Sequence, residues 1–166
     1  MNKTLVILLL LMQGMTTESR SQQSKPPMPD NIKMLTPGHI YMNSINTRAI
    51  RDFISRHKEA TDVIWYSLSN GFIVRFFDDS AMARSAYNCN GRWVYTIKQY
   101  LEKDMPRSVR HLVKSTYYDY EISLVEEVKQ PGDLVKYVVH MQDNVSWKNV
   151  LVFDGQMELI EDRKKL

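Results

Sequence analysis

The chain of 166 residues contains a single cysteine, Cys89, so it cannot form an internal disulfide bond. Its stability must therefore come from a packed core. A hydrophobic content of 43% at this length is enough for one or two small domains. Cys89 lies in the turn-like sequence Asn88 to Gly91, with no neighbouring base that would lower the pKa of its thiol. A role for this cysteine as a nucleophile is therefore disfavoured.

The sequence also lacks the short motifs of the common catalytic and metal sites. It has no H-E-x-x-H or C-x-x-C spacing, no G-x-S-x-G elbow and no glycine-rich phosphate loop. The acid pairs Asp78-Asp79 and Glu126-Glu127 join sequence neighbours, whose side chains would point to opposite faces of a strand. We therefore expect a non-catalytic protein without cofactor or metal. A small exported enzyme with an unrecognised site is the alternative.

Neither sign of charge is in large excess. The chain has 22 Lys and Arg residues against 19 Asp and Glu residues, which gives a formal net charge of +3. The basic residues are scattered among acids and form no basic stripe of the kind that nucleic-acid-binding proteins carry. Nucleic acid is therefore not expected as a partner.

No apolar run is long enough to span a bilayer, which takes about 20 residues. The apolar run from Thr4 to Met12 follows a basic start at Lys3 and ends in polar sequence, as in a secretory signal peptide. We assign residues 1–20 to this peptide, with cleavage between Gly14 and Ser21. A retained single-span anchor is the alternative. The prediction is a periplasmic or secreted protein with no stable membrane span after cleavage.

Residues 21–46 are expected to form a polar linker or arm. This stretch contains Pro26, Pro27 and Pro29, and adjacent prolines favour an extended, solvated backbone. The more apolar part that follows is interrupted at Pro37-Gly38. It is expected to pack, if anywhere, along an edge of the folded domain.

The first periodic unit, residues 47–104, begins with an amphipathic helix. Ile50, Phe53, Ile54 and His57 recur at helical spacing in Thr47 to Ala60, and Asn46 is a suitable N-cap. His57 is more simply a packed residue of this face than a ligand. The period then changes to two, and Asn-Gly and Asp-containing turns separate four predicted strands, Asp62–Ser69, Phe72–Phe77, Ala81–Tyr87 and Arg92–Tyr100.

The second unit, residues 105–166, has the same order. Asp104 is a candidate cap, Pro106 suits a first helical turn, and Val109, Leu112 and Val113 form the apolar helix face. An aromatic hinge with Tyr117, Tyr118 and Tyr120 leads into the strands. These are predicted at Tyr120–Lys129, Leu134–Gln142, Val145–Phe153 and Gln156–Glu161, followed by a frayed tail.

The two units align with one constant offset through the helix and the first strand, which indicates an internal repeat. Arg48 to Arg51 match Arg107 to Arg110, and Val63 matches Ile122. The predicted fold is α+β: a tandem repeat of a helix plus a four-stranded antiparallel meander. The two repeats would form one compact domain with a continuous sheet and both helices on one face.

The face of this sheet turned away from the helices is the candidate binding surface. Ile122, Leu124 and Val128 are predicted to point toward the helix, and Ser123 and Val125 away from it. When the same alternation is applied to the other strands, aromatic, apolar and basic side chains lie on the open face. The candidate binding residues are Tyr66, Arg75, Phe77, Lys136 and His140. A register shift of one residue would reverse every assignment, and these side chains would then finish a second small core.

Three stretches of the chain carry a family resemblance. They are Met105-Pro106-Arg107-Ser108-Val109, Tyr117 to Ile122, and Asn90-Gly91-Arg92-Trp93 leading into Tyr100. Over about Thr47 to Glu161 the sequence resembles the PepSY-like and β-lactamase-inhibitor-protein-like (BLIP-like) exported domains of Bacteroidetes envelope proteins. This resemblance implies a concave sheet backed by helices.

The same resemblance implies an unidentified protein or peptide partner in the cell envelope, because related domains bind or inhibit other proteins, including peptidases and β-lactamases. The β-lactamase inhibitor itself has disulfide bonds within its repeats, which Cys89 alone excludes here. This departure from the family's pattern disfavours inhibition of a β-lactamase in particular.

Overall fold

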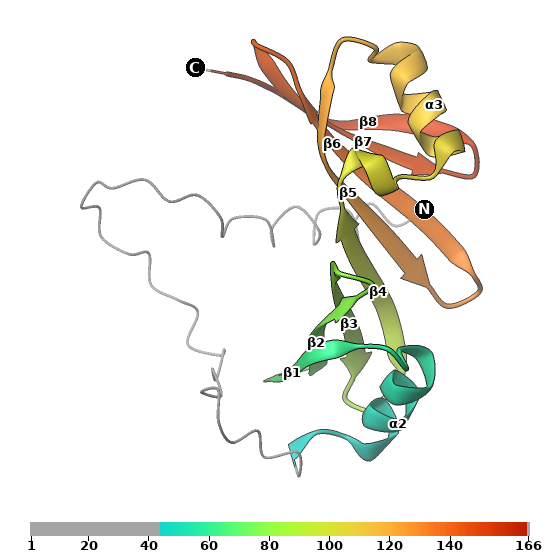
Figure 1. The fold of residues 1–166 in the computed structure, drawn as a ribbon. Helices are drawn as coiled ribbons and strands as arrows, with labels where there is room; N and C mark the ends of the chain where they lie inside the picture. The colour runs from blue at the N-terminus through green and yellow to red at the C-terminus, as the bar shows by residue number, and fades with distance from the viewer. Residues whose placement is uncertain (1–43, 166) are drawn as a thin grey trace.

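The computed structural model describes residues 44–165, and the signal peptide and most of the arm predicted above lie outside these residues. The described chain contains one antiparallel sheet of eight strands, in which each strand pairs with the next one along the sequence (Figure 1). This confirms the α+β class. None of the helices within residues 44–165 is both long and apolar enough to cross a membrane.

Each half of the described chain has a helix followed by four strands. The first half comprises α2 (Thr47–Arg56), β1 (Thr61–Leu68), β2 (Gly71–Asp78), β3 (Ala81–Asn88) and β4 (Trp93–Tyr100). The second half comprises α3 (Arg107–Thr116), β5 (Glu121–Gln130), β6 (Leu134–Gln142), β7 (Ser146–Phe153) and β8 (Gln156–Lys164). A short 3-10 helix, η2 (Glu102–Asp104), connects the halves, and β4 pairs with β5 to join them into one sheet.

Helix α2 packs on the first four strands through one apolar side. Asn46 caps it as predicted, because its side-chain oxygen accepts a hydrogen bond from the backbone N–H of Arg48 at 2.9 Å. The helix ends at Arg56, before the predicted end at Ala60. The first core is aromatic and consists of Ile45, Ala49, Phe53, Trp65, Val74, Phe76, Ala83 and Tyr87.

Helix α3 covers the last four strands in the same way. Its buried residues Val109 and Val113 belong to a core with Met105, Ile122, Val125, Val139, Met141, Val150 and Val152. The predicted cap Asp104 is wrong, because Asp104 closes the 3-10 turn η2 and Pro106 occupies the N-cap position of α3. The tyrosine hinge packs in part: Tyr117 and Tyr120 contact each other edge-on, whereas Tyr118 is 80% exposed.

Strand β5 contains a β-bulge, so its register differs from the predicted one. The pairing of β5 with β6 shifts between Ile122 and Leu124, where one strand has an extra residue. Ile122 therefore faces the helix as predicted, but beyond the bulge it is Val125 that enters the core beneath α3. Leu124 and Val128 point to the opposite face, and Val125 points inward, contrary to the prediction.

The residues as far as Lys165 are ordered, contrary to the predicted frayed tail. Strand β8 continues to Lys164, with Trp147 opposite Arg163 and Ser146 opposite Lys164. Beyond the strand, the backbone N–H of Lys165 donates to the carbonyl of Val145 at 2.7 Å. The predicted end of this strand at Glu161 was therefore too early.

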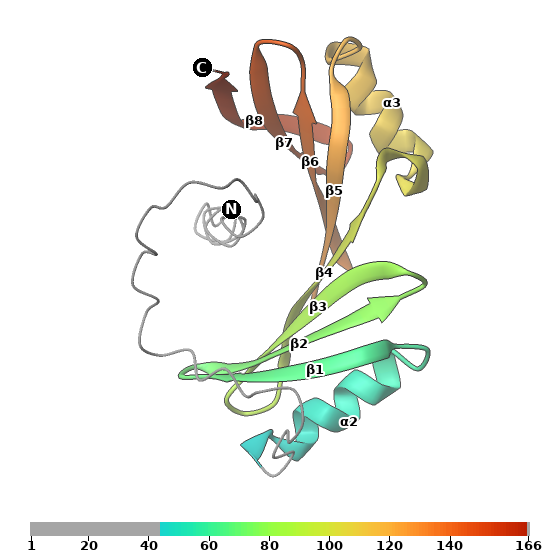
Figure 2. The same ribbon diagram turned by 60° about the vertical axis from the view of Figure 1, so that its left-hand side comes forward.

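The sheet is bent so that its helix-free face lies on the inside of the curve and both helices lie on the outside (Figure 2). Curvature brings side chains on the inner face together, and they form a third apolar cluster without any covering helix. This cluster contains Ile97, Val128, Val138 and Leu151, with Tyr95 and Ile160 at its margin. The inner face is called the open face below.

Candidate functional site

The structure places all five predicted binding residues on the open face. Val74 and Phe76 pack beneath α2, so Arg75 and Phe77, which alternate with them on β2, point the other way. Tyr66 follows the buried Trp65 on β1 and likewise points to the open face. On β6, Lys136 and His140 alternate with Val139, which belongs to the core beneath α3.

These five residues do not form one cluster. Tyr66, Arg75 and Phe77 lie on the first two strands, whereas Lys136 and His140 lie on β6, four strands away from β2. At the usual spacing of neighbouring strands this separation is roughly 19 Å. A partner would have to cover several strands to contact both groups.

The outer part of the open face is apolar and accessible. Phe77 on β2 pairs directly with Met82 on β3, and the two side chains are 40% and 43% exposed. At the opposite end, Trp147 on β7 is 48% exposed, with the ammonium group of Lys165 5.1 Å from its ring centre. Large apolar groups left in water at both ends of one face are typical of an interaction surface.

The middle of the open face contains a buried network of charged groups that the sequence did not reveal. The Glu126 side chain on β5 is fully buried, and one of its carboxylate oxygens accepts a hydrogen bond from Gln99 at 2.6 Å. Arg84 Nη2 lies 3.6 Å from the same oxygen, and His140 Nε2 lies 3.7 Å from the other oxygen. His140 Nδ1 is 2.7 Å from the amide oxygen of Asn149, which continues the network to β7.

This network sets the ionisation of Glu126. Burial alone would raise the pKa of its carboxyl group, but hydrogen bonds from His140 and Gln99, together with the charges of His140 and Arg84, lower the pKa below its ordinary value. Glu126 therefore remains a carboxylate inside an apolar surface. Its partners come from β3, β4 and β6, so the network ties four neighbouring strands together.

His140 is thus a buried member of an ion network and not an exposed contact residue. A histidine beside a buried carboxylate is also what an unrecognised enzyme site would need. However, neither His140 nor Glu126 lines the two hollows described next. Within residues 44–165 no group of three or more His, Cys, Asp or Glu side chains could hold a metal ion.

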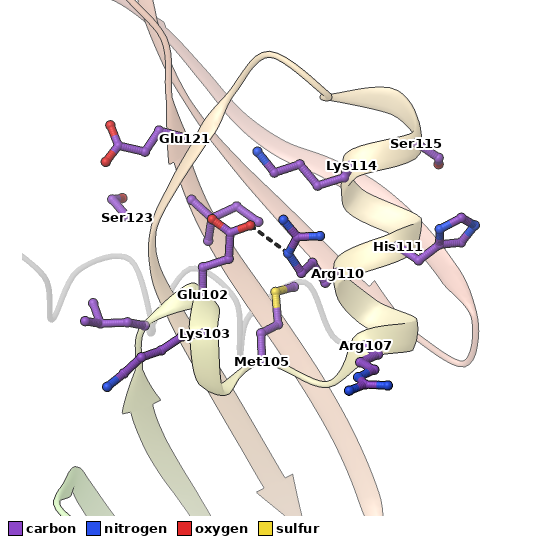
Figure 3. A pocket seen from close by; sticks show the side chains of 12 residues that line it. Glu102, Lys103, Met105, Arg107, Arg110, His111, Lys114, Ser115, Glu121 and Ser123 are labelled. Atoms are coloured by element: carbon purple, nitrogen blue, oxygen red, sulfur yellow. Dashed lines mark hydrogen bonds and ion pairs between the residues drawn. The ribbon is translucent and has the colours of Figure 1, made fainter.

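The larger of these two hollows lies on the helix side of the sheet, between η2, α3 and the start of β5, and has a volume of about 1260 Å³ (Figure 3). Arg110 and Lys114 extend from α3 toward β5 across it. Arg110 Nε bonds to a carboxylate oxygen of Glu102 at 2.8 Å, and Lys114 donates to the carbonyl of Tyr120. Neighbouring basic residues give this hollow an excess of positive charge.

The smaller hollow, of about 460 Å³, lies between the end of α2, strand β4 and the hairpin that connects β5 to β6. His57 contributes to it from the end of α2, where its ring packs on Phe53 and Phe76. Burial lowers the pKa of His57, which favours the neutral ring. The hollow also contains the ion pairs Lys98–Asp78 at 3.0 Å and Lys129–Glu127 at 2.9 Å. The two lysines of this hollow are therefore already paired with acids.

The fold is similar to those of solved Bacteroides proteins. A BLIP-like protein from Bacteroides fragilis has a TM-score of 0.61 and 13% identity, over 76% of this chain and 89% of that one. A DUF2874 family protein from Bacteroides ovatus has a TM-score of 0.60 and 19% identity, over 73% and 88% of the two chains. Another DUF2874 family protein, from Bacteroides uniformis, has a TM-score of 0.58 and 14% identity, over 72% and 88%.

At this level of identity the similarity concerns the fold. The BLIP-like resemblance predicted from the sequence is confirmed in that sense, whereas none of these three proteins is described as a PepSY domain. A comparison with models of protein families gives no match, and a comparison with curated proteins gives none either.

Proposed function

We propose that this chain is an exported, non-catalytic protein that binds a protein or peptide partner in the cell envelope through its open face. The observation that carries the proposal is the exposed pair Phe77 and Met82 on a sheet face that neither helix covers. Arg75 lies two residues from Phe77 on the same face of β2, Tyr66 pairs with Ile73 further along that strand, and Lys136 on β6 pairs with Val128.

Rigidity of this face supports the proposal. The Glu126 network and the third apolar cluster hold the central strands together beneath the surface. A preorganised surface loses less conformational entropy on binding than a flexible one. If the partner is an enzyme and the open face covers its active site, such binding would inhibit it.

Export is supported by the N-terminal sequence and by the fold. The basic start and short apolar run of residues 1–20 are typical of a cleaved signal peptide, and residues 21–46 would follow as an arm. A structure of similar fold from Bacteroides eggerthii, with a TM-score of 0.58 and 12% identity, is described as a candidate periplasmic protein. We infer a periplasmic or secreted location.

We also infer that the fold arose by duplication of one unit, residues 47–104 and 105–166. The shared element order and the constant offset between the two helix sequences support this origin. Both β1 and β5 also have a bulge near their start, since the pairing shifts between Thr61 and Ile64 and between Ile122 and Leu124.

Affinity capture from envelope extracts with two matched variants tests the binding proposal. The open-face variant changes Tyr66→Ser, Arg75→Glu and Phe77→Ser. The control makes the same three kinds of change outside the open face, with Tyr118→Ser, Arg51→Glu and Ile54→Ser, all at exposed positions. We expect the open-face variant to lose a partner that the wild type and the control retain. Equal capture by all three proteins would refute the proposal.

A further inference from the structure

Helix α3 is basic along its whole length on the part of its surface that borders η2 and the start of β5. Arg107, Arg110, His111 and Lys114 recur at the spacing of one helix side, and α3 contains no acidic residue. The corresponding positions of α2 in the first unit are Arg48, Arg51, Asp52 and Ser55. The fold therefore does not require a basic surface here, because α2 replaces half of it with an acid and a serine.

All four basic residues line the hollow of about 1260 Å³ between α3, η2 and β5 (Figure 3). Lys103 adds a further cation, and Glu102 and Glu121 are the two acids of the lining. Glu102 is paired with Arg110, and within residues 44–165 neither Lys103 nor Arg107 forms an ion pair. The hollow thus has uncompensated positive charge.

The floor of the hollow is apolar and reaches an open strand edge. Leu101, which is 55% exposed, and Ile122 contribute the apolar surface. Strand β4 pairs with β5 only from Val125 to Lys129, so the first residues of β5 have no strand on their β4 side. An unpaired strand edge offers backbone hydrogen-bonding groups to an extended peptide.

We propose that this hollow binds an acidic segment of a partner polypeptide in an extended conformation. The backbone of the segment lies along the open edge of β5, near Glu121 to Ser123, and its carboxylates face Arg107, Arg110 and Lys114. The strand edge selects a polypeptide over other polyanions, and the cations select acidic side chains. This site lies on the side of the sheet opposite the open face and is independent of the proposed binding there.

Fluorescence anisotropy with defined peptides tests this site in the full mature chain. The probe is a fluorescein-labelled ten-residue peptide of alternating glutamate and valine, and its control alternates lysine and valine. The variant Arg107→Glu/Arg110→Glu reverses two charges in the hollow. The matched variant Arg48→Glu/Arg51→Glu reverses the equivalent charges on α2, and circular dichroism checks that both variants fold.

The site requires that the acidic peptide binds, that the lysine peptide does not, and that rising salt weakens the binding. Reversal at Arg107 and Arg110 should weaken affinity by about tenfold or more, whereas the α2 variant should change it less than about twofold. The bound peptide should slow amide hydrogen exchange at Glu121 to Ser123. Equal losses in both variants, absence of binding, or tighter binding of dextran sulfate with unchanged exchange in β5 would overturn the proposal.

Discussion

Glu126 and His140 face each other across neighbouring strands, with Oε2 and Nε2 3.7 Å apart, on the side of the sheet that carries no helix. Their residues are 0% and 8% exposed. A buried carboxylate is stable only with compensating partners. Here those partners are Gln99, Arg84 and His140, so the centre of the open face is fixed by charge as well as by apolar packing.

Replacing Glu126 with glutamine should destabilise the fold. The change removes the charge that compensates Arg84 and puts an uncharged amide beside Gln99 and His140, which costs about 3 kcal/mol of the free energy of unfolding. Urea denaturation at neutral pH measures this loss. Glu158→Gln is the control, because Glu158 is exposed on β8 and its replacement should cost less than about 0.5 kcal/mol.

Acid should weaken the fold through the same residue. The pKa of Glu126 is lower in the folded state than its ordinary value of 4.5, so the unfolded chain binds a proton more readily. The stability contributed by the carboxylate is therefore complete above that ordinary pKa and is lost as the pH falls through the folded pKa. Urea midpoints between neutral and acidic pH should show a steeper decline in the wild type than in Glu126→Gln. Parallel curves would contradict this role.

Two glycines with the same backbone conformation should respond differently to alanine. Gly91 and Gly155 both have φ of +70° in hairpin turns, so either alanine is strained by about 1 kcal/mol. A Cβ on Gly91 would also lie 2.6 Å from Asn46 Oδ1 and 2.9 Å from the backbone nitrogen of Ala49. A Cβ on Gly155 meets no atom within 4 Å.

Gly91→Ala should therefore displace the cap of α2 and cost about 1–2 kcal/mol more than Gly155→Ala, because Asn46 would lose its hydrogen bond to Arg48. Thermal unfolding of the two variants gives the comparison. Equal melting temperatures would show that the turn between β3 and β4 does not support the helix.

Deleting the C-terminal segment from Arg163 to Leu166 should reduce stability. The deletion removes the pairing of Arg163 and Lys164 with β7, and with it the contact of Lys165 with the Trp147 ring. We expect a loss of about 1–2 kcal/mol, since a few strand pairs and one cation–π contact disappear. Denaturation followed by tryptophan fluorescence measures it. An unchanged midpoint of unfolding would contradict this expectation and would indicate that the tail frays, as predicted from its charged composition.

The helices and hairpins were predictable because their signals are local. Apolar spacing placed Phe53 and Val113 on the buried helix sides, and Asn90-Gly91 and Asp154-Gly155 marked turns that the structure contains. The face on which each of the five candidate binding residues lies was also predictable, because it depends only on the alternation of side chains along β1, β2 and β6. No bulge interrupts the parts of these strands on which the candidate residues lie.

What could not be predicted depends on contacts distant in the sequence. The bulge between Ile122 and Leu124 reverses the face of every later residue in β5, and no glycine marks it. By the predicted alternation Glu126 and Glu127 point to opposite faces, and Glu126 shares the helix side with Leu124 and Val128. The bulge instead places Glu126 on the open face, where Arg84 and His140 from the separate strands β3 and β6 surround it.

Site-specific photo-crosslinking in living cells is the decisive measurement for binding by the open face. A photoreactive phenylalanine replaces Phe77 or Trp147 on the open face, and Ile54 or Tyr118 outside it, all of which are exposed. We predict covalent adducts with one envelope protein from Phe77 or Trp147 and none from Ile54 or Tyr118. Adducts only from Ile54 or Tyr118, or from none of the four positions, would contradict binding by this face.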